Sequence, residues 1–459
     1  MLVATCNLVE QARNEPFSSS PVEPIQSVHI TAAPPQDLMT PGPVDCGTFL
    51  RLYYPSVHPI SETVAQHSLW PLWAEDEYLV GFVKFMQAVL ARWPSWAPRG
   101  EFLCIDQVAY LAPVMHLGCT HMWRLLNGKV YCPILRNAPI STEKQWPVIV
   151  FSHGMGCSRF AYSRLCTDLA SHGFLVAAVE HRDASAAVSF TMEDGRRKWI
   201  PFRRVLDSEK EYTVRNSQLL QRVEEVKRSL DVVTSLAGGQ AVTNVLLEAE
   251  QFDLAMFADR LDLSRPVLAG HSYGGATTLM ALARDNRFHH GLVLDGWLFP
   301  LKEEQINPAQ PIVFINTESF MNRDNIAKMK TFLRDKDQDR RLIFIKGSVH
   351  QNHIDAPLIF KAGILKRIMG FQSETDPVLV LDLNDKLMLH FIWSHLGLEV
   401  DGEVVAFLEQ HGDVLVEATD ESIAGDDSEL ADMTKGVVTE IVSEKNEYVE
   451  KIDETKNVA

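Results

Sequence analysis

A chain of 459 residues is long for one domain, and with 46% hydrophobic and 22% charged residues it has an ordinary globular composition that can bury a large core. Its formal net charge of −17 excludes nucleic acid as an expected partner, because a polyanion repels an acidic protein. No run of 18 apolar residues is present, so no transmembrane span is expected.

The N-terminal part of the chain changes character near residue 45. Residues 1–44 are rich in proline and serine and are expected to be disordered, and they show no secretory signal. Residues 47–55 follow with the pattern of an opening strand. Two mostly apolar helical segments come next, at 77–93 and 106–126.

From residue 147 short apolar strands alternate with helices, which predicts a mostly parallel sheet covered by helices on both faces. Strands are expected at 148–151, 174–179, 266–269, 292–294, 312–315 and 342–345. Helices are expected at 159–171, within 209–236, at 276–281, 322–333 and 382–396.

The C-terminal segment from residue 417 holds 13 acidic residues and 4 lysines and is expected to be a mostly disordered tail. The catalytic domain is therefore expected at 45–416. The seven cysteines are dispersed, without a Cys-x-x-Cys pair, which favours free thiols in a reducing compartment. We therefore expect a cytoplasmic protein.

The most informative motif is Gly270-His271-Ser272-Tyr273-Gly274. An apolar strand leads into it and a helix of small residues leads away. This is the setting of a nucleophile elbow, in which glycines let strand and helix approach around a strained serine. The pattern predicts that Ser272 is a nucleophile rather than a helix cap.

A serine nucleophile needs a base and an orienting acid, each on a loop after a later strand. His350 follows the last predicted strand and is the expected base, with His353 as a competitor. Asp295 and Glu318 each follow a strand after the serine, and the pattern leaves them equally eligible as the acid. In sheets of this kind such residues gather at the carboxyl ends of the strands.

The oxyanion of a tetrahedral intermediate needs two backbone N–H donors. The residue after the nucleophile, Tyr273, is expected to supply one. The other is expected from Met155 in the glycine-containing loop Ser152-His153-Gly154-Met155-Gly156, which follows an early strand.

Several segments together resemble one family, the platelet-activating factor acetylhydrolases of the plasma and type II kind. The matching segments are residues 47–55, 150–154, 179–183, 215–216, 270–277, 294–301, 314–316 and 346–352. The resemblance covers about residues 46–398. Tyr273, Gly296 and Met155 depart from the family pattern, which usually has phenylalanine, alanine and leucine at these positions.

The resemblance implies an α/β-hydrolase fold with Ser272 as nucleophile, Asp295 as acid and His350 as base. It implies that Met155 and Tyr273 donate to the oxyanion and that Trp297 and Gln351 shape the acyl pocket. No cofactor or metal is implied.

The implied enzyme is a 1-alkyl-2-acetylglycerophosphocholine esterase, a serine hydrolase of the calcium-independent phospholipase A2 type. It would cleave the sn-2 acetyl, short or oxidised acyl ester of platelet-activating factor and related phospholipids. Residues 77–126 fall where relatives dock on a membrane or lipoprotein surface, although burial in the core is the alternative. A carboxylesterase or neutral lipase with the same triad, and a non-catalytic lipid-binding protein, are the rival hypotheses.

Overall fold

The computed structural model describes residues 31–41, 47–56, 71–90, 130–132, 134, 138–246, 252–320, 323–335, 338–360, 370–419 and 423. Its strands are β1 (Thr31–Met39), β2 (Phe49–Ser56), β3 (Trp146–Ser152), β4 (Leu175–Val179), β5 (Val188–Glu193), β6 (Arg196–Pro201), β7 (Leu261–His271), β8 (His290–Leu294), β9 (Ile312–Thr317), β10 (Arg340–Ile345) and β11 (Leu415–Glu417). Its helices are α3 (Asp76–Leu90), α5 (Ser163–Ser171), α6 (Glu211–Ala237), α7 (Tyr273–Arg284), α8 (Arg323–Leu333), α9 (Ala356–Ile359), α11 (Pro377–Leu396) and α12 (Gly402–Gln410). Short 3-10 turns include η5 (Glu318–Phe320) and η6 (His350–His353).

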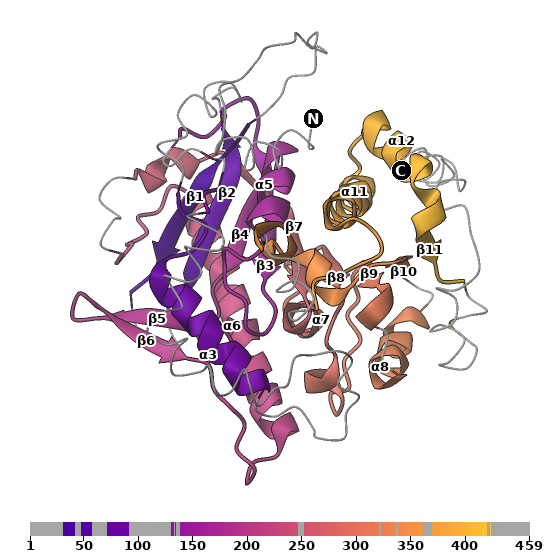
Figure 1. Cartoon of the computed structure of the whole chain (residues 1–459). Helices are drawn as coiled ribbons and strands as arrows, with labels where there is room; N and C mark the ends of the chain where they lie inside the picture. The colour runs from indigo at the N-terminus through magenta and orange to yellow at the C-terminus, as the bar shows by residue number, and fades with distance from the viewer. Residues whose placement is uncertain are drawn as a thin grey trace, which may run out of the picture.

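In the described part of the chain, nine strands form one sheet in the order β1-β2-β4-β3-β7-β8-β9-β10-β11 (Figure 1). The six central strands, from β4 to β10 in this order, are parallel to one another, whereas β1, β2 and β11 pair antiparallel at the edges. The prediction of a mostly parallel sheet is confirmed. The parallel strands all end at the same edge, where the loops that carry the candidate site begin.

Helices cover both faces of this sheet, because the central strands are apolar on both sides. In β3, Val148 and Val150 face a core that also contains α6, α7 and α8, whereas Ile149 and Phe151 face one that contains α5, α11 and α12. Figure 1 shows α7 and α11 on opposite sides of the strands. No helix in the described ranges has both the length and the apolar character that crossing a membrane requires.

The predicted domain boundaries differ from the structure at both ends. β1 lies within residues 1–44, so the expectation of disorder is wrong for Thr31–Met39, which pairs with β2 despite two prolines at a bulge. At the other end Glu417 closes β11 and Ile423 is buried in the core, so the tail begins later than residue 417. Most of the other residues of these two segments lie outside the described ranges.

The two predicted apolar helices have different outcomes. The first is α3, and the second, at residues 106–126, lies outside the described residues. A hairpin that the sequence did not predict, β5–β6, packs beside α3 (Figure 1). Cys157 and Cys166 are free thiols, as expected for these two.

A half-buried carboxylate attaches β1 to the rest of the molecule. Asp37 accepts two hydrogen bonds from Arg51, at 2.7 and 3.0 Å, and two from Arg159, at 3.1 and 2.7 Å. Although burial alone would raise its pKa, Arg159 and Arg51 hold the pKa of Asp37 well below its ordinary value. The charged form of Asp37 therefore stabilises the folded state.

We expect Asp37→Asn to lower the free energy of unfolding by about 2 kcal/mol, because both guanidinium groups lose their charged acceptor. Urea denaturation at neutral pH measures this loss. A carboxyl whose pKa is depressed by folding contributes stability that is fully present above its unfolded pKa of about 3.9 and is lost as the pH falls through the folded value. The gap between wild type and Asp37→Asn should therefore narrow below about pH 4. The control is Asp194→Asn, which changes an exposed carboxylate at the hairpin tip; a gap independent of pH would contradict the role of Asp37.

Candidate active site

Ser272 occupies a strained turn between β7 and α7. Its backbone has a φ of 56° and a ψ of −115°, a combination that residues with a side chain rarely adopt. A Cβ added to Gly270 would lie 2.3 Å from the Gly274 carbonyl oxygen, and one added to Gly274 would lie 1.9 Å from that of Ser152. Only glycine fits at these two positions, as the nucleophile-elbow pattern requires.

Asp295 and His350 are brought together from different strand ends. Asp295 directly follows β8, and His350 begins η6 after β10. The imidazole donates from Nδ1 to Asp295 Oδ2 at 3.0 Å, and Phe320 stacks on its ring with centroids 3.8 Å apart. The side chain of His350 is 21% exposed, so Nδ1 faces the protein while the ring reaches the surface.

The Asp295 carboxylate is fully buried and heavily hydrogen-bonded. Oδ1 accepts from the backbone N–H of Thr317 at 2.6 Å, and Oδ2 accepts from the Thr317 hydroxyl in addition to His350. Burial alone would raise the pKa of Asp295, but the neighbouring histidines, His353 first, hold it well below its ordinary value. Asp295 is therefore an anion that can stabilise a positive charge on His350.

The geometry distinguishes between the two candidate acids and between the two candidate bases that the sequence pattern left open. Glu318 Oε2 accepts from the backbone N–H of Gly347 at 2.7 Å, so Glu318 supports the turn before His350. His353 also approaches Asp295, with Nε2 3.4 Å from Oδ2, but its side chain is fully buried whereas His350 is partly exposed. Of the two histidines beside Asp295, His350 is thus the one that a substrate could reach.

Ser272 and His350 are linked through a shared neighbour. The ring of His271, the residue before the serine, lies 4.5 Å from the His350 ring. Within the described residues the Ser272 hydroxyl makes no hydrogen bond, and 9% of the residue is exposed. Catalytic hydrogen bonds of this kind are often long in the free enzyme and tighten when substrate binds.

The glycine-containing loop after β3 lies against the serine. A Cβ on Gly154 would lie 3.2 Å from Ser272 Cβ, and the Gly154 N–H donates to the Tyr162 hydroxyl at 2.9 Å. The backbone N–H groups of Met155 and Tyr273 have no acceptor among the residues described. Both expected oxyanion donors are therefore free to bind a ligand oxygen.

Arg222 contacts both backbone segments that carry these donors, and the sequence analysis did not predict this role. It is fully buried on α6, donates from Nη1 to the carbonyl oxygen of His153 at 2.7 Å, and lies 4.3 Å from the Tyr273 ring centroid. Asp183 balances its charge, with Oδ2 3.1 Å from Nε. A single charged residue in a long helix carries no sequence signal for this role.

Trp297 and Gln351 are both half-buried. Trp297 donates its backbone N–H to the Ser272 carbonyl oxygen at 2.8 Å, and its ring packs edge-on against Tyr273 at 5.3 Å. Gln351 is the second residue of η6. An apolar cavity of about 50 Å³ lies elsewhere, between α3 and the loops that follow Gly156 and His353, and neither residue is among its described lining.

Comparison with known proteins identifies the family. Residues 90–423 match the model of the family "Platelet-activating factor acetylhydrolase, isoform II". A relative with the name platelet-activating factor acetylhydrolase from Bos taurus is 36% identical over 363 residues, which cover 77% of this chain and 73% of that protein. One of the same name from Canis lupus familiaris is 35% identical over 385 residues, 82% and 77% of the two chains. The chain belongs to this family.

Two further similarities lie outside the mammalian members of the acetylhydrolase family. A putative phospholipase A2 from Schizosaccharomyces pombe is 25% identical over 311 residues, 56% of this chain and 69% of that protein. A ferulic acid esterase from Streptomyces cinnamoneus is similar in structure, with a TM-score of 0.54 and 17% identity over 86% of this chain and 98% of that one. This second similarity concerns the fold, and the predicted α/β-hydrolase fold is confirmed.

We expect Thr317→Val to slow the reaction of Ser272 with a fluorophosphonate probe by about tenfold or more. The variant loses the hydrogen bond from the Thr317 hydroxyl to the buried Asp295 carboxylate, a bond worth about 1.5–3 kcal/mol. Asp295 is then held less firmly in the position from which it orients His350. The measurement is the second-order rate of probe labelling. Thr331→Val is the matched control, because that hydroxyl is on an exposed residue of α8 and donates to the Lys328 carbonyl. Equal labelling rates for wild type and Thr317→Val would contradict the role given to Asp295.

Proposed function

We propose that this chain is a serine esterase that hydrolyses the sn-2 acetyl, short or oxidised acyl ester of platelet-activating factor and related phospholipids. The observation that carries the proposal is the His350–Asp295 pair at the sheet edge that also holds the strained Ser272. Membership of the acetylhydrolase family supports the substrate class. The products would be a lyso-phospholipid and a carboxylic acid.

In the first half of the proposed reaction, Ser272 Oγ attacks the ester carbonyl while His350 Nε2 takes the hydroxyl proton. His350 can accept at Nε2 because its Nδ1 proton is held by Asp295. The negative charge that develops on the carbonyl oxygen is bound by the N–H groups of Met155 and Tyr273. His350 then returns the proton to the leaving oxygen, and the lyso-phospholipid departs.

In the second half, His350 takes a proton from water, and the hydroxide formed attacks the acyl-serine. The second tetrahedral intermediate then collapses to the acid, and His350 returns the proton to the leaving Ser272 Oγ, which regenerates the free serine. Nucleophile, base and oxyanion donors all come from the chain, so we propose that the reaction is independent of calcium. We place the acyl group beside Trp297 and Gln351, because the Trp297 backbone N–H is hydrogen-bonded to the Ser272 carbonyl oxygen.

We further propose that the enzyme docks on a membrane or lipoprotein surface through α3 and the neighbouring hairpin. The apolar residues Leu79, Phe82 and Phe85 of α3 are half-buried rather than buried. Residues 196–204, which contain β6, include five arginines and lysines in a chain whose net charge is −17. Three of them form ion pairs with Glu75, Glu193 and Glu209, and the other two, Arg196 and Arg204, are exposed and form no ion pair within the described ranges. A locally basic face would orient such an acidic protein on anionic lipid. The free thiols of Cys157 and Cys166 suit the cytoplasmic leaflet of a membrane.

Substrate profiling tests the proposed reaction. We expect the purified protein to hydrolyse platelet-activating factor faster than a phospholipid with a long sn-2 chain or a triacylglycerol. Ser272→Ala should lose about three or more decades of kcat, because it removes the nucleophile. Ser208→Ala, at an exposed serine, is the control. Preference for long-chain triacylglycerol would indicate a neutral lipase, and a catalytically inert wild type that fails to label would indicate a non-catalytic protein.

Vesicle binding tests the docking face. Arg196 and Arg204 are exposed and form no ion pair within the described ranges, so we expect the double variant Arg196→Gln/Arg204→Gln to bind phosphatidylserine vesicles about thirtyfold less tightly, at about 1 kcal/mol for each charge. The loss should shrink at high salt. Arg323→Gln/Arg334→Gln, at two exposed arginines of the α8 region, is the charge-matched control. Equal weakening by both double variants would refute a local docking face.

A further inference from the structure

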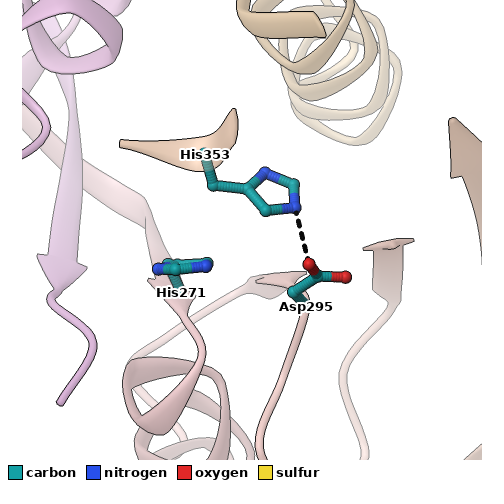
Figure 2. A group of neighbouring side chains, drawn as sticks. All are labelled: His271, Asp295 and His353. Carbon is teal, nitrogen blue, oxygen red and sulfur yellow. Dashed lines mark ion pairs between the residues drawn. The ribbon is translucent and has the colours of Figure 1, made fainter. Parts of the chain in front are cut away.

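Behind the candidate site, three side chains converge that could bind a metal ion. His271 ends β7, Asp295 follows β8, and His353 ends η6 (Figure 2). All three are buried, and one ligand atom from each lies within 4.8 Å of the other two. His271 and His353 have not been assigned a catalytic task.

The histidines of this group present nitrogen atoms without hydrogen-bond partners. His271 uses Nδ1 with the Tyr162 hydroxyl at 2.8 Å, but its buried Nε2 has no partner in the described part of the chain. Both ring nitrogens of His353 also lack a hydrogen-bond partner there, and Nε2 forms an ion pair with Asp295 Oδ2 at 3.4 Å, which Figure 2 draws. Leaving buried polar atoms unpaired is costly, so these nitrogens point to a ligand.

We propose that His271 Nε2, His353 Nε2 and Asp295 Oδ2 bind a zinc ion, and that the bound ion inhibits the enzyme. Two imidazoles and one carboxylate are ligands that Zn²⁺ prefers, whereas Ca²⁺ and Mg²⁺ prefer oxygen alone. Neighbouring donors of a tetrahedral zinc site lie about 3.3–3.4 Å apart, and the His353–Asp295 separation is 3.4 Å. The ligand atoms of the group lie within 4.8 Å of one another, so the His271 nitrogen would have to move closer to the other two ligand atoms by at most about 1.5 Å.

Neighbouring residues orient two of the three proposed zinc ligands. When His271 carries its proton on Nδ1, it donates to the Tyr162 oxygen and turns the Nε2 lone pair towards Asp295. Thr317 fixes the carboxylate through the backbone bond to Oδ1. Partners of this kind orient metal ligands and are part of the binding energy.

Inhibition follows from the shared oxygen. Asp295 Oδ2, the proposed zinc ligand, is also the acceptor for His350 Nδ1. A divalent cation on this oxygen cancels the charge that would stabilise protonated His350 and competes for the same lone pairs. The ion therefore opposes the reaction and takes no part in it. The inhibition rests on the proposed function, whereas zinc binding itself does not.

Binding is tested without any catalysis. Zinc chloride is titrated calorimetrically into metal-free Ser272→Ala protein, and Co²⁺ is added as a probe whose visible absorption reports tetrahedral coordination. We expect one tight site that weakens about a hundredfold or more in Ser272→Ala/His353→Phe. The chain has 16 histidines, so the control is Ser272→Ala/His411→Phe, which removes an imidazole at the end of α12. Equal zinc affinity in both double variants would overturn the site.

Inhibition is tested with the active protein, each variant being compared with its own metal-free rate. Zinc should inhibit wild type and His411→Phe, EDTA should reverse the effect, and Mg²⁺ should have none. His353→Phe and His353→Gln should both resist zinc; the glutamine keeps a polar group if phenylalanine impairs folding. Equal inhibition of the His353 variants, or tight binding without inhibition, would overturn the proposal. Zinc binding that depends on His353 in a protein without esterase activity would refute the proposed function alone.

Discussion

The candidate site depends on one buried charge, the carboxylate of Asp295. A carboxylate away from water is tolerated only when hydrogen-bond donors surround it, and here the donors come from Thr317 and His350. Thr317 is the last residue of β9 and His350 follows β10, the two strands beyond β8. The parallel register, which pairs Leu294 with Ile315, therefore places the charge, its donors and the base at one edge of the sheet.

The oxyanion side of the site is held by close backbone packing and by a second buried charge. Gly274 allows α7 to approach the Ser152 carbonyl, which sets the distance between the elbow and the loop after β3. Arg222 then holds the His153 carbonyl and the Tyr273 ring at the same time. Since Asp183 neutralises Arg222 inside the protein, the backbone donors are oriented by a network that needs no net buried charge.

The sequence predicted the parts of this molecule that depend on local pattern. The central strands are apolar on both faces, and Ser272 lies in a motif whose glycines are required by the sharp turn between a strand and a helix. β1 and the β5–β6 hairpin were missed, because a bulged strand with two prolines and a polar edge strand lack the alternation of a buried strand. Spacing alone could not choose between Asp295 and Glu318, since both follow strands, and the hydrogen bond of Glu318 to a turn N–H exists only in three dimensions.

Helix α3 packs against the loop that carries the expected oxyanion donor, although its apolar side chains are only half-buried. The Phe85 ring packs so closely on Gly156 that a Cβ there would lie 2.3 Å from it, and Gly156 adjoins the expected donor Met155. Near the start of the helix, the Tyr78 hydroxyl donates to buried Glu180 at 2.9 Å and accepts from Arg159 at 2.7 Å. A displacement of α3 at a lipid surface would therefore be transmitted to the loop that holds the expected oxyanion donor. Because the contact is an aromatic ring on a glycine, a shift of α3 has to move this loop or open a gap in the packing.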